Sequence, residues 1–503
     1  MYKSLDSGRN FTAIYLDISK YFDKIWHKGL LHKCKHDFGI SDSVFNWLKS
    51  YLCNRRQRVQ INNTFSTTHI INAGCPQGSV LGPLLALMYL DGLPRRTKND
   101  ILLFADDTSL YASHTTADFN ETQLSLQRDL DEIYKYGREW AITFNTTKTI
   151  QQTFSHKQQH TPPALTFGGD PIPIHDSHTH LGIALSTDLR FHQHVNVICK
   201  KVNQTLSPLY PIAQYIPRPI LDQIYKIYIR PHFDYCDTVY DGLITIYDAI
   251  RLETLQNRAG RLVTGTLFRT PTANLLLDLG WDKLSTRRRI HKLALYHSFN
   301  NPQHQIPDYI KTIMPGTRTQ HTGKLLRNAN THTIASNRTT SYQNSFFLST
   351  GKLWNNLPEP TRTLSQTSFK REIAERLGAP TPPAYYATGS KMGNILHTRL
   401  RTEMSHLNSH LFQIHKHDTS ECSCGHLVEN ARHFILYCPN YVPKRHELAQ
   451  NISQALDIDF LSLPPLIQLR ILIHGDTLGS EDGRVVACHF QNFLINSHRF
   501  TNI

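Results

Sequence analysis

Short apolar runs before residue 190 predict β-strands. Residues 11–18 are almost continuously apolar and end near Asp17, a pattern typical of a buried strand. Residues 57–71 alternate on either side of Asn62 and Asn63, which predicts a hairpin with a tight turn. The remaining strand-like segments, each bounded by polar turn residues, are 101–104, 109–112, 142–154 and 165–185.

Apolar side chains between these strands recur every three or four positions, which predicts amphipathic helices. Ser41 stands at the expected N-cap of one helix, and Val44, Phe45, Leu48 and Leu52 mark its apolar face. The predicted helices cover 28–38, 41–52, 81–93 and 126–141. Strands and helices in this order predict an α+β fold in which helices back an antiparallel sheet.

The pattern beyond residue 190 is helical, and two breaks interrupt it. Residues 315–345 are rich in Thr, Asn, Arg and Ser, and residues 379–383 are rich in proline. We therefore expect four parts: a sheet domain at 1–188, a helical domain at 189–312, a linker and small connecting region at 313–395, and a C-terminal region at 396–503.

The composition describes a basic globular protein. Hydrophobic residues make up 40% and charged residues 19% of the 503 positions, which is enough apolar material for real cores. The formal net charge is +14, and a balance of that size favours polyanionic partners, nucleic acid first. Solubility alone is the alternative explanation of the charge.

Cysteine usage and hydropathy favour a reducing, intracellular setting. The nine cysteines are mostly scattered, but three cluster within 422–438, which suits one metal site better than a disulfide framework. The N-terminus lacks the pattern of a signal peptide. The longest apolar run, 80–90, contains Gly82 and Pro83 and is too short to span a bilayer, so no membrane partner is expected.

Three aspartates suggest chemistry that uses divalent cations. Asp17 closes a predicted strand, and Asp106 and Asp107 stand at the tip of a predicted tight hairpin. Carboxylates that converge from rigid elements repel one another unless cations neutralise them, and two Mg²⁺ ions do so in nucleotidyl transfer. By itself an Asp-Asp turn is more often ordinary solvated turn chemistry, so this interpretation depends on the flanking segments.

A second cluster of potential metal ligands lies near the C-terminus. Cys422-x-Cys424-Gly425 is followed by His433-x₄-Cys438, and two thiolates on a glycine turn with a later His and Cys can close a tetrahedral Zn²⁺ site. His426 is a further candidate ligand, although it stands close to Cys424. The site could help to bind nucleic acid, or it could only hold the tail folded.

Five segments of the first domain resemble, in order and spacing, the motifs of reverse transcriptases from non-LTR retrotransposons of the jockey or LINE type. The third has the Phe-Ala-Asp-Asp form typical of these elements. The five segments are 17–23, 74–84, 104–107, 145–149 and 180–182. The resemblance covers residues 1 to about 185 and implies a right-hand polymerase palm, followed by a helical thumb-like domain and a small C-terminal zinc segment.

The resemblance implies a set of catalytic residues. Asp17 and Asp106 would bind two Mg²⁺ ions, for which Mn²⁺ could substitute, and Asp107 would assist them. Lys148 matches the lysine that neutralises or protonates the leaving pyrophosphate, although a solvated surface lysine is the alternative.

Nucleotide-binding residues follow from the same resemblance. Phe22 matches the ring that excludes a 2′-hydroxyl and so selects deoxynucleotides, although a core Phe is the alternative. Gln77 and Gly78 would line the nucleotide and template pocket. Tyr21 departs from the family, which usually has Ala at this position, and its ring stands beside the predicted gate.

These implications predict an RNA-directed DNA polymerase whose partners are an RNA template, a DNA primer or target, and deoxynucleoside triphosphates. We expect it to act in the nucleus after a cytoplasmic ribonucleoprotein stage. Only 16 residues precede Asp17, so we expect a fragment without fingers and endonuclease. The alternative is a catalytically inactive remnant that acts at most as a nucleic-acid-binding zinc protein.

Overall fold

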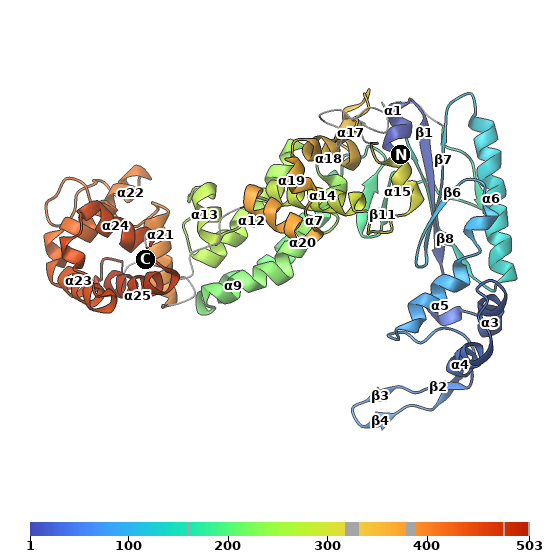
Figure 1. Ribbon diagram of the computed structural model, residues 1–503, viewed down its shortest axis with the longest axis horizontal. Helices are drawn as coiled ribbons and strands as arrows, with labels where there is room; N and C mark the ends of the chain where they lie inside the picture. The colour runs from blue at the N-terminus through green and yellow to red at the C-terminus, as the bar shows by residue number, and fades with distance from the viewer. Residues whose placement is uncertain (158–160, 317–330, 379–388, 476–477, 501–503) are drawn as a thin grey trace. The chain divides into compact units, whose positions relative to one another are not determined.

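The computed structural model describes residues 1–157, 161–316, 331–378, 389–475 and 478–500. The chain forms two compact units, and each is considered by itself (Figure 1). The first comprises Met1–Gln193 with Ser336–Gln343, and the second comprises His194–Ala335 with Asn344–Ile503. The predicted proline-rich break at 379–383 and much of the linker predicted at 315–345 lie outside the described residues.

A four-stranded antiparallel sheet forms the centre of the first unit. Its strand order is β6 (Asp100–Phe104), β7 (Asp107–His114), β1 (Asn10–Ile18) and β8 (Phe144–Phe154). The apolar β1 lies between two neighbours, where side chains on both of its faces are buried. The strands predicted at 11–18, 101–104 and 142–154 are confirmed, and the segment predicted at 109–112 is the middle of β7.

Residues 165–185 do not join this sheet. They form two small antiparallel ribbons, β9 (Thr166–Phe167) with β10 (Asp170–Pro171) and β11 (Ser177–His180) with β12 (Ile183–Ser186). Each ribbon folds back on itself at a tight turn with positive φ, at 168–169 and at 181–182. The apolar alternation of this segment therefore predicts strands correctly but does not reveal their partners.

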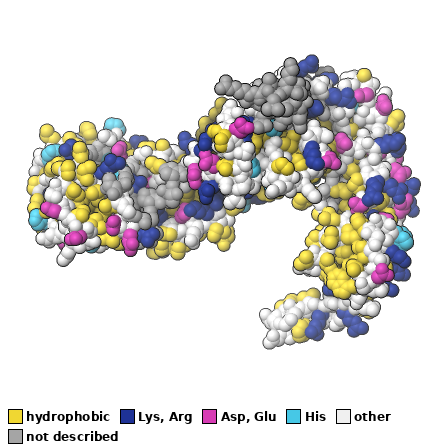
Figure 2. All heavy atoms as spheres, viewed as in Figure 1, with side chains coloured by type: hydrophobic (Ala, Val, Ile, Leu, Met, Phe, Trp, Pro, Cys, Tyr) yellow, Lys and Arg dark blue, Asp and Glu magenta, His cyan; other side chains and the backbone are white. Residues whose placement is uncertain are grey.

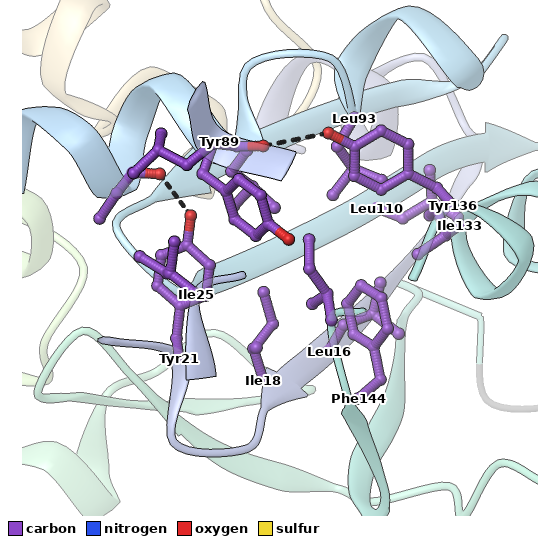
Figure 3. Packing of buried hydrophobic residues seen from close by; sticks show 14 of the residues in the cluster. Leu16, Ile18, Tyr21, Ile25, Tyr89, Leu93, Leu110, Ile133, Tyr136 and Phe144 are labelled. Atoms are coloured by element: carbon purple, nitrogen blue, oxygen red, sulfur yellow. Dashed lines mark hydrogen bonds between the residues drawn. The ribbon is translucent and has the colours of Figure 1, made fainter. Parts of the chain in front are cut away.

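Helices cover one face of the sheet and enclose the main core of the unit. They are α3 (His27–His36), α4 (Asp42–Leu52), α5 (Leu81–Leu90) and α6 (Phe119–Glu139). Leu16 and Ile18 of β1 pack with Tyr89 of α5 and Tyr136 of α6 in this core (Figure 3). Short helices complete the unit: α1 (Tyr2–Asp6), α2 (Tyr21–Lys24), η1 (Pro94–Arg96) and α17 (Thr340–Gln343). The α+β class is confirmed.

Several helix predictions needed correction at their ends. The helix predicted at 28–38 ends at His36, and that predicted at 81–93 ends at Leu90. The packed face of α4 consists of Phe45, Leu48 and Leu52. Val44, which was predicted on that face, lies outside it and is 56% exposed. Ser41 is the N-cap residue, but its hydroxyl binds the carboxylate of Asp42 instead of the helix backbone.

The predicted hairpin at 57–71 is confirmed. β3 (Gln60–Ile61) pairs with β4 (Thr64–Phe65) across the two asparagines, and Asn62 has φ of 52°. The strands β2 (Arg55–Gln57) and β5 (His69–Ile71) extend the hairpin toward its base.

The second unit is built of helices. Its elements are α7 (His192–Leu206), α8 (Leu209–Ile212), η2 (Ala213–Tyr215), α9 (Arg218–Ile224), η3 (Tyr225–Ile229), α10 (Arg230–Asp234), α11 (Asp237–Tyr240), α12 (Ile246–Thr264), α13 (Thr272–Leu279), α14 (Leu284–Asn300), α15 (Asp308–Ile313), α18 (Phe346–Asn355), α19 (Glu359–Arg362), α20 (Gln366–Leu377), α21 (Lys391–Arg401), α22 (Asn408–Gln413), η5 (His433–Tyr437), η6 (Pro439–Tyr441), α23 (Val442–Leu456), η7 (Phe460–Ser462), α24 (Pro465–His474) and α25 (Ser480–Asn496).

Two apolar clusters organise this unit. Trp354 packs with Tyr296 and Phe369 between α14, α18 and α20. A second cluster spans α21 to α25 and includes the buried Cys422 and Cys438. The division of this unit into thumb-like, connecting and C-terminal parts stays a prediction. Within the described residues, every helix is too short or too polar to cross a membrane.

Candidate active site and metal centre

Asp17 is positioned by the alternation of β1. Leu16 and Ile18 point into the helix-covered core, so Tyr15 and Asp17 face the other side of the sheet. An open pocket of about 340 Å³ lies on that side. It is lined by Tyr15, Leu16, Asp17, Asp107, Thr108, Lys148, His178, Thr179 and His180.

The turn between β6 and β7 holds Asp106. Phe104 pairs with Asp107, so the two turn residues are Ala105, with φ of 54°, and Asp106. The prediction that both aspartates stand at the tip is therefore wrong by one position, because Asp107 already opens β7. The two carboxylates leave the hairpin from different backbone environments.

The register of the sheet brings two aspartates opposite each other. Leu16 pairs with Thr108, and one further step along the ladder places Asp107 beside Asp17. Partial burial raises the pKa of Asp107, and the negative charges of Asp106 and Asp17 raise it further. The three predicted carboxylates thus form one patch of concentrated negative charge.

This patch has the chemistry of a magnesium site. Carboxylate oxygens are the hard ligands that Mg²⁺ prefers, and a cation relieves the mutual repulsion that raises the pKa of Asp107. The three carboxylates are more widely spread than the ligand atoms of two other groups among the described residues, which lie within 4.8 Å of one another. The kind of donor fits the ion, and binding of the ion would draw the carboxylates closer together.

Lys148 lies in a bulge that aims it at Asp17. The register between β1 and β8 shifts between Tyr15 and Asp17, which leaves the residues after Asn145 looped out of the ladder. The Asn145 carboxamide oxygen accepts hydrogen bonds from the backbone nitrogen of Thr147 at 3.2 Å and from its hydroxyl at 2.7 Å. Lys148 Nζ lies 3.8 Å from Asp17 Oδ2, although the lysine side chain is 69% exposed.

The first and second predicted motifs pack against each other through their backbones. The Cys75 nitrogen donates to the Phe22 carbonyl oxygen at 2.8 Å. Gly74 has φ of 89°, and a Cβ there would stand 2.8 Å from the carbonyl oxygens of Phe22 and Asp23. Gln77 Nε2 donates to Asp23 Oδ1 at 2.8 Å. Glycine at position 74 is therefore required for this contact.

The structure does not bring every predicted residue to one pocket. Asp17, Asp107 and Lys148 line it, but Asp106, Phe22, Gln77 and Gly78 do not. Phe22 is partly buried against the main core, and its predicted role as a gate stays a prediction.

Tyr21, the departure from the family, is accommodated in the core. Its side chain is 4% exposed and lies among the core residues drawn in Figure 3. Its hydroxyl donates to the carbonyl oxygen of Ala86 in α5, and its ring meets that of Phe22 edge-on at 5.6 Å. The tyrosine therefore fixes α2 against α5 and stands behind Phe22.

Two histidines line the pocket that the sequence did not suggest as site residues. The rings of His178 and His180 both pack on Tyr15, with centroids 4.5 and 4.9 Å from that of Tyr15 and 6.4 Å from each other. His180 Nε2 lies 3.4 Å from the Ser109 hydroxyl. Burial, with His180 and His175 nearby, lowers the pKa of His178 to about 4, so its ring is neutral at pH 7. Their spacing of two residues indicates that both side chains lie on the same face of a strand. It does not reveal that they contact Tyr15, which is far away in the sequence.

The four predicted zinc ligands converge. Cys422, Cys424, His433 and Cys438 each offer an atom within 4.8 Å of the other three. Cys422 Sγ lies 3.7 Å from Cys438 Sγ, and Cys424 Sγ lies 3.3 Å from His433 Nε2. Zn–S bonds of about 2.3 Å separate tetrahedral sulfur ligands by about 3.8 Å, so the residues fit zinc.

Local backbone geometry brings these ligands together. Gly425, with φ of 90°, closes the knuckle, and its nitrogen donates to the Cys422 carbonyl oxygen. The π-helical turn η5 then lets the Cys438 nitrogen donate to the His433 carbonyl oxygen at 2.7 Å. His426 is outside the ligand group and stacks on His433 at 4.1 Å.

The surroundings shift the pKa values of the three thiols in different directions. Burial raises the pKa of Cys422 to about 12, and burial also raises that of Cys438. The backbone of His426 lowers the pKa of Cys424. A bound cation would favour all three thiolates, because metal ligation requires deprotonated sulfur.

A buried ion pair supports the cluster from behind. Glu429 is 1% exposed and accepts two hydrogen bonds from Arg499, at 2.7 and 2.5 Å. Its carboxylate also accepts from the backbone nitrogen of Asn408 and lies 3.8 Å from Cys422 Sγ. The segments that carry Asn408 and Arg499 are thereby tied to the ligand loop.

The other convergent ligand group, Asp234, Asp237 and His291, is better explained as an ion-pair network. Arg287 donates to both carboxylate oxygens of Asp234, at 3.0 and 2.7 Å, and His291 contacts Asp237 at 2.6 Å. The guanidinium occupies the oxygens that a cation would need.

Comparison with known proteins agrees with this geometry. Residues 4–185 match the family model described as reverse transcriptase (RNA-dependent DNA polymerase). The chain is 31% identical over 290 residues to a probable RNA-directed DNA polymerase from transposon X-element of Drosophila melanogaster, covering 56% of this chain and 31% of that protein. It is 28% identical over 298 residues to the RNA-directed DNA polymerase from mobile element jockey of the same species, covering 57% and 32%.

Residues 4–185 are therefore a reverse transcriptase domain. The predicted relationship to the reverse transcriptases of non-LTR retrotransposons, jockey among them, is confirmed. The chain spans about a third of the length of these curated relatives.

Proposed function

We propose that this chain is an RNA-directed DNA polymerase that copies RNA into DNA by metal-dependent nucleotidyl transfer. The observation that carries the proposal is the placement of Asp17 and Asp107 on adjacent strands, with Asp106 in the adjoining turn and Lys148 3.8 Å from Asp17. This gathers acidic and basic groups at one edge of a rigid sheet, as attack on a triphosphate requires.

The carboxylates would hold the metals. Asp17 and Asp106 would bind two Mg²⁺ ions, or Mn²⁺, with Asp107 assisting. Bound there, the ions would supply activation of a primer 3′-hydroxyl and charge stabilisation on the leaving pyrophosphate. Lys148 would then neutralise or protonate that pyrophosphate, and its exposure leaves it free to move from Asp17 toward the phosphates.

The packing of the two motifs supports a nucleotide site beside the carboxylates. Phe22 would stand under the incoming sugar, and Gln77 and Gly78 would line the nucleotide and template pocket. The Gln77–Asp23 hydrogen bond and the close approach of Gly74 hold this loop against α2, the short helix that carries Phe22.

Other parts of the chain would serve nucleic acid. The partners would be an RNA template, a DNA primer or target, and deoxynucleoside triphosphates, with nuclear action as the proposed setting. Residues 1–188 would be the palm and 189–312 a thumb-like domain. Cys422, Cys424, His433 and Cys438 would bind one Zn²⁺ within the C-terminal region 396–503, which follows the connecting region 313–395.

A primer-extension assay tests the polymerase proposal. The full chain should extend a DNA primer on an RNA template with Mg²⁺ and deoxynucleotides, and Asp106→Asn should abolish extension. Asp100→Asn is the matched control, because it makes the same charge change at the exposed far end of β6 and should leave activity intact. Salt-sensitive RNA binding without extension by the unmodified chain would contradict the proposal and favour the inactive nucleic-acid-binding alternative.

A further inference from the structure

The segment between α4 and the end of α5 has an unusual charge pattern. Ser43–Leu90 contains no Asp or Glu, in a chain that has 40 acidic residues among 503. Within it, four basic residues fall close together: Lys49, Arg55, Arg56 and Arg58. We call residues 47–71, which carry all four, the basic arm. Such a segment has a local positive field that its own sequence does not offset.

The basic arm extends from the core of the first unit. Figure 1 shows the β3–β4 hairpin as a projection beyond α4, and Figure 2 shows Lys and Arg side chains along it. Lys49, Arg56 and Arg58 are exposed, and Arg55 is half-buried. Within the part of the chain that the structure describes, none of the four forms an ion pair with a carboxylate. Their charges are therefore available to a partner.

Aromatic rings stand beside these cations. The Arg58 guanidinium lies 3.8 Å from the centroid of the Phe65 ring, and that of Arg55 lies 5.4 Å from the Tyr51 ring. Tyr51 in turn stacks on Trp47 at 5.9 Å. Trp47 and Phe65 are 55% and 46% exposed, which leaves part of each ring open for stacking.

We propose that the basic arm binds single-stranded nucleic acid, with its arginines on phosphates and with Trp47 and Phe65 stacking on unpaired bases. Two guanidinium groups of the arm each lie against an aromatic ring, and this combination suits a flexible strand whose bases are free. A duplex would offer phosphates but no base faces. A protein partner would have to supply carboxylates as well as an apolar surface.

The surface is separate from the pocket at Asp17. Its binding does not depend on catalysis, and only the identity of the natural strand, an RNA template awaiting copying, rests on the proposed function. The basic arm and the active site can therefore fail independently.

The test measures binding of the full chain without deoxynucleotides, using fluorescent 20-nucleotide oligouridine, oligothymidine and a blunt duplex. Arg55→Ala/Arg56→Ala/Arg58→Ala should weaken binding of both single strands and reduce the slope of log affinity against log salt by about 2, since each phosphate contact on a single strand contributes about 0.7. Trp47→Ala and Phe65→Ala should each weaken single-strand binding by about fivefold or more, with little effect on the duplex.

The matched control is Arg128→Ala/Lys135→Ala/Arg138→Ala. It removes the same charge from exposed positions on α6 and should leave the salt slope within experimental error. Equal losses in the arm and control variants would overturn the proposal, because net charge alone would then explain binding. Unchanged oligonucleotide affinity in the arm variant would also overturn the proposal. Loss of self-association in that variant, measured by light scattering, together with unchanged affinity would show that the arm binds a second copy of the chain instead. Oligouridine preferred to oligothymidine would identify RNA as the strand, and the reverse would identify DNA.

Discussion

Tyr21 offers the sharpest test of how this chain accommodates a departure from its family. The side chain is 4% exposed and sits behind Phe22, with its hydroxyl bound to the carbonyl oxygen of Ala86. Tyr21→Ala introduces the residue that the resemblance to the family leads us to expect at this position. The structure nevertheless predicts a loss of about 3–5 kcal/mol, because truncation of a buried aromatic ring leaves a cavity between α2 and α5.

Tyr21→Phe separates the ring from the hydroxyl. It keeps the packed ring and removes only the hydrogen bond, so the expected loss is about 1 kcal/mol. The difference in stability between the two variants thus depends on the contacts of this side chain and not on catalytic activity.

Thiol labelling under native conditions measures these losses locally. Cys34 is completely buried in the same core, so its labelling rate reports opening of the core. Tyr21→Ala should raise that rate by a factor between about 10² and about 4 × 10³, since every 1.4 kcal/mol is a factor of ten. Tyr21→Phe should raise it about fivefold. Cys199, which is buried in the second unit, is the internal control and should be labelled at an unchanged rate.

A Cys34 rate in Tyr21→Ala equal to that of the unmodified chain would refute the reasoning. It would mean that α2 and α5 close over the space left by the ring, and that the contact with Ala86 contributes nothing measurable.

Three further predictions follow from described contacts. Burial lowers the pKa of Lys33 from 10.5 to about 8, so between pH 8 and 10.5 the unfolded state binds one more proton than the folded state. The free energy of unfolding should therefore rise with pH across that window by up to about 3 kcal/mol. Urea midpoints measured at pH 8 and 10 should show this rise, and Lys33→Met should remove it. Gly74→Ala should destabilise the first unit by at least about 1 kcal/mol in urea unfolding, because its Cβ would meet two carbonyl oxygens, whereas Gly39→Ala, also at positive φ but in open space, should cost less. Elemental analysis should find one zinc per chain, lost on treatment with a chelator and in Cys438→Ser but kept in Cys488→Ser; full zinc content in the first variant would remove Cys438 from the ligand set.

Local patterns predicted well what is held together by nearby residues. The four predicted zinc ligands lie within one short segment, so their spacing alone predicted that they lie near one point. The hairpin around Asn62 also depends only on its own turn. The helix-covered face of β1 followed from its apolar run.

Features that depend on pairing between distant segments could not be predicted. The sequence around residue 17 does not indicate that β7 and β8 flank β1. The position of Asp107 in the strand and not in the turn depends on the register between β6 and β7. His178 and His180 were missed as pocket residues because Tyr15, the ring that both of them contact, belongs to the first strand. The ribbons at 165–185 were recognised as strands, but not as separate from the main sheet.

The central place of β1 has a consequence for synthesis of the protein. β1 leaves the ribosome before its partners β7 and β8, which end at His114 and Phe154. Until then the nascent chain carries an apolar strand with two open edges, the kind of surface that recruits other strands. Messages interrupted before Phe154 would therefore yield aggregation-prone peptides instead of a partly assembled four-stranded sheet. Truncated copies of such a gene should place their load on cellular chaperones.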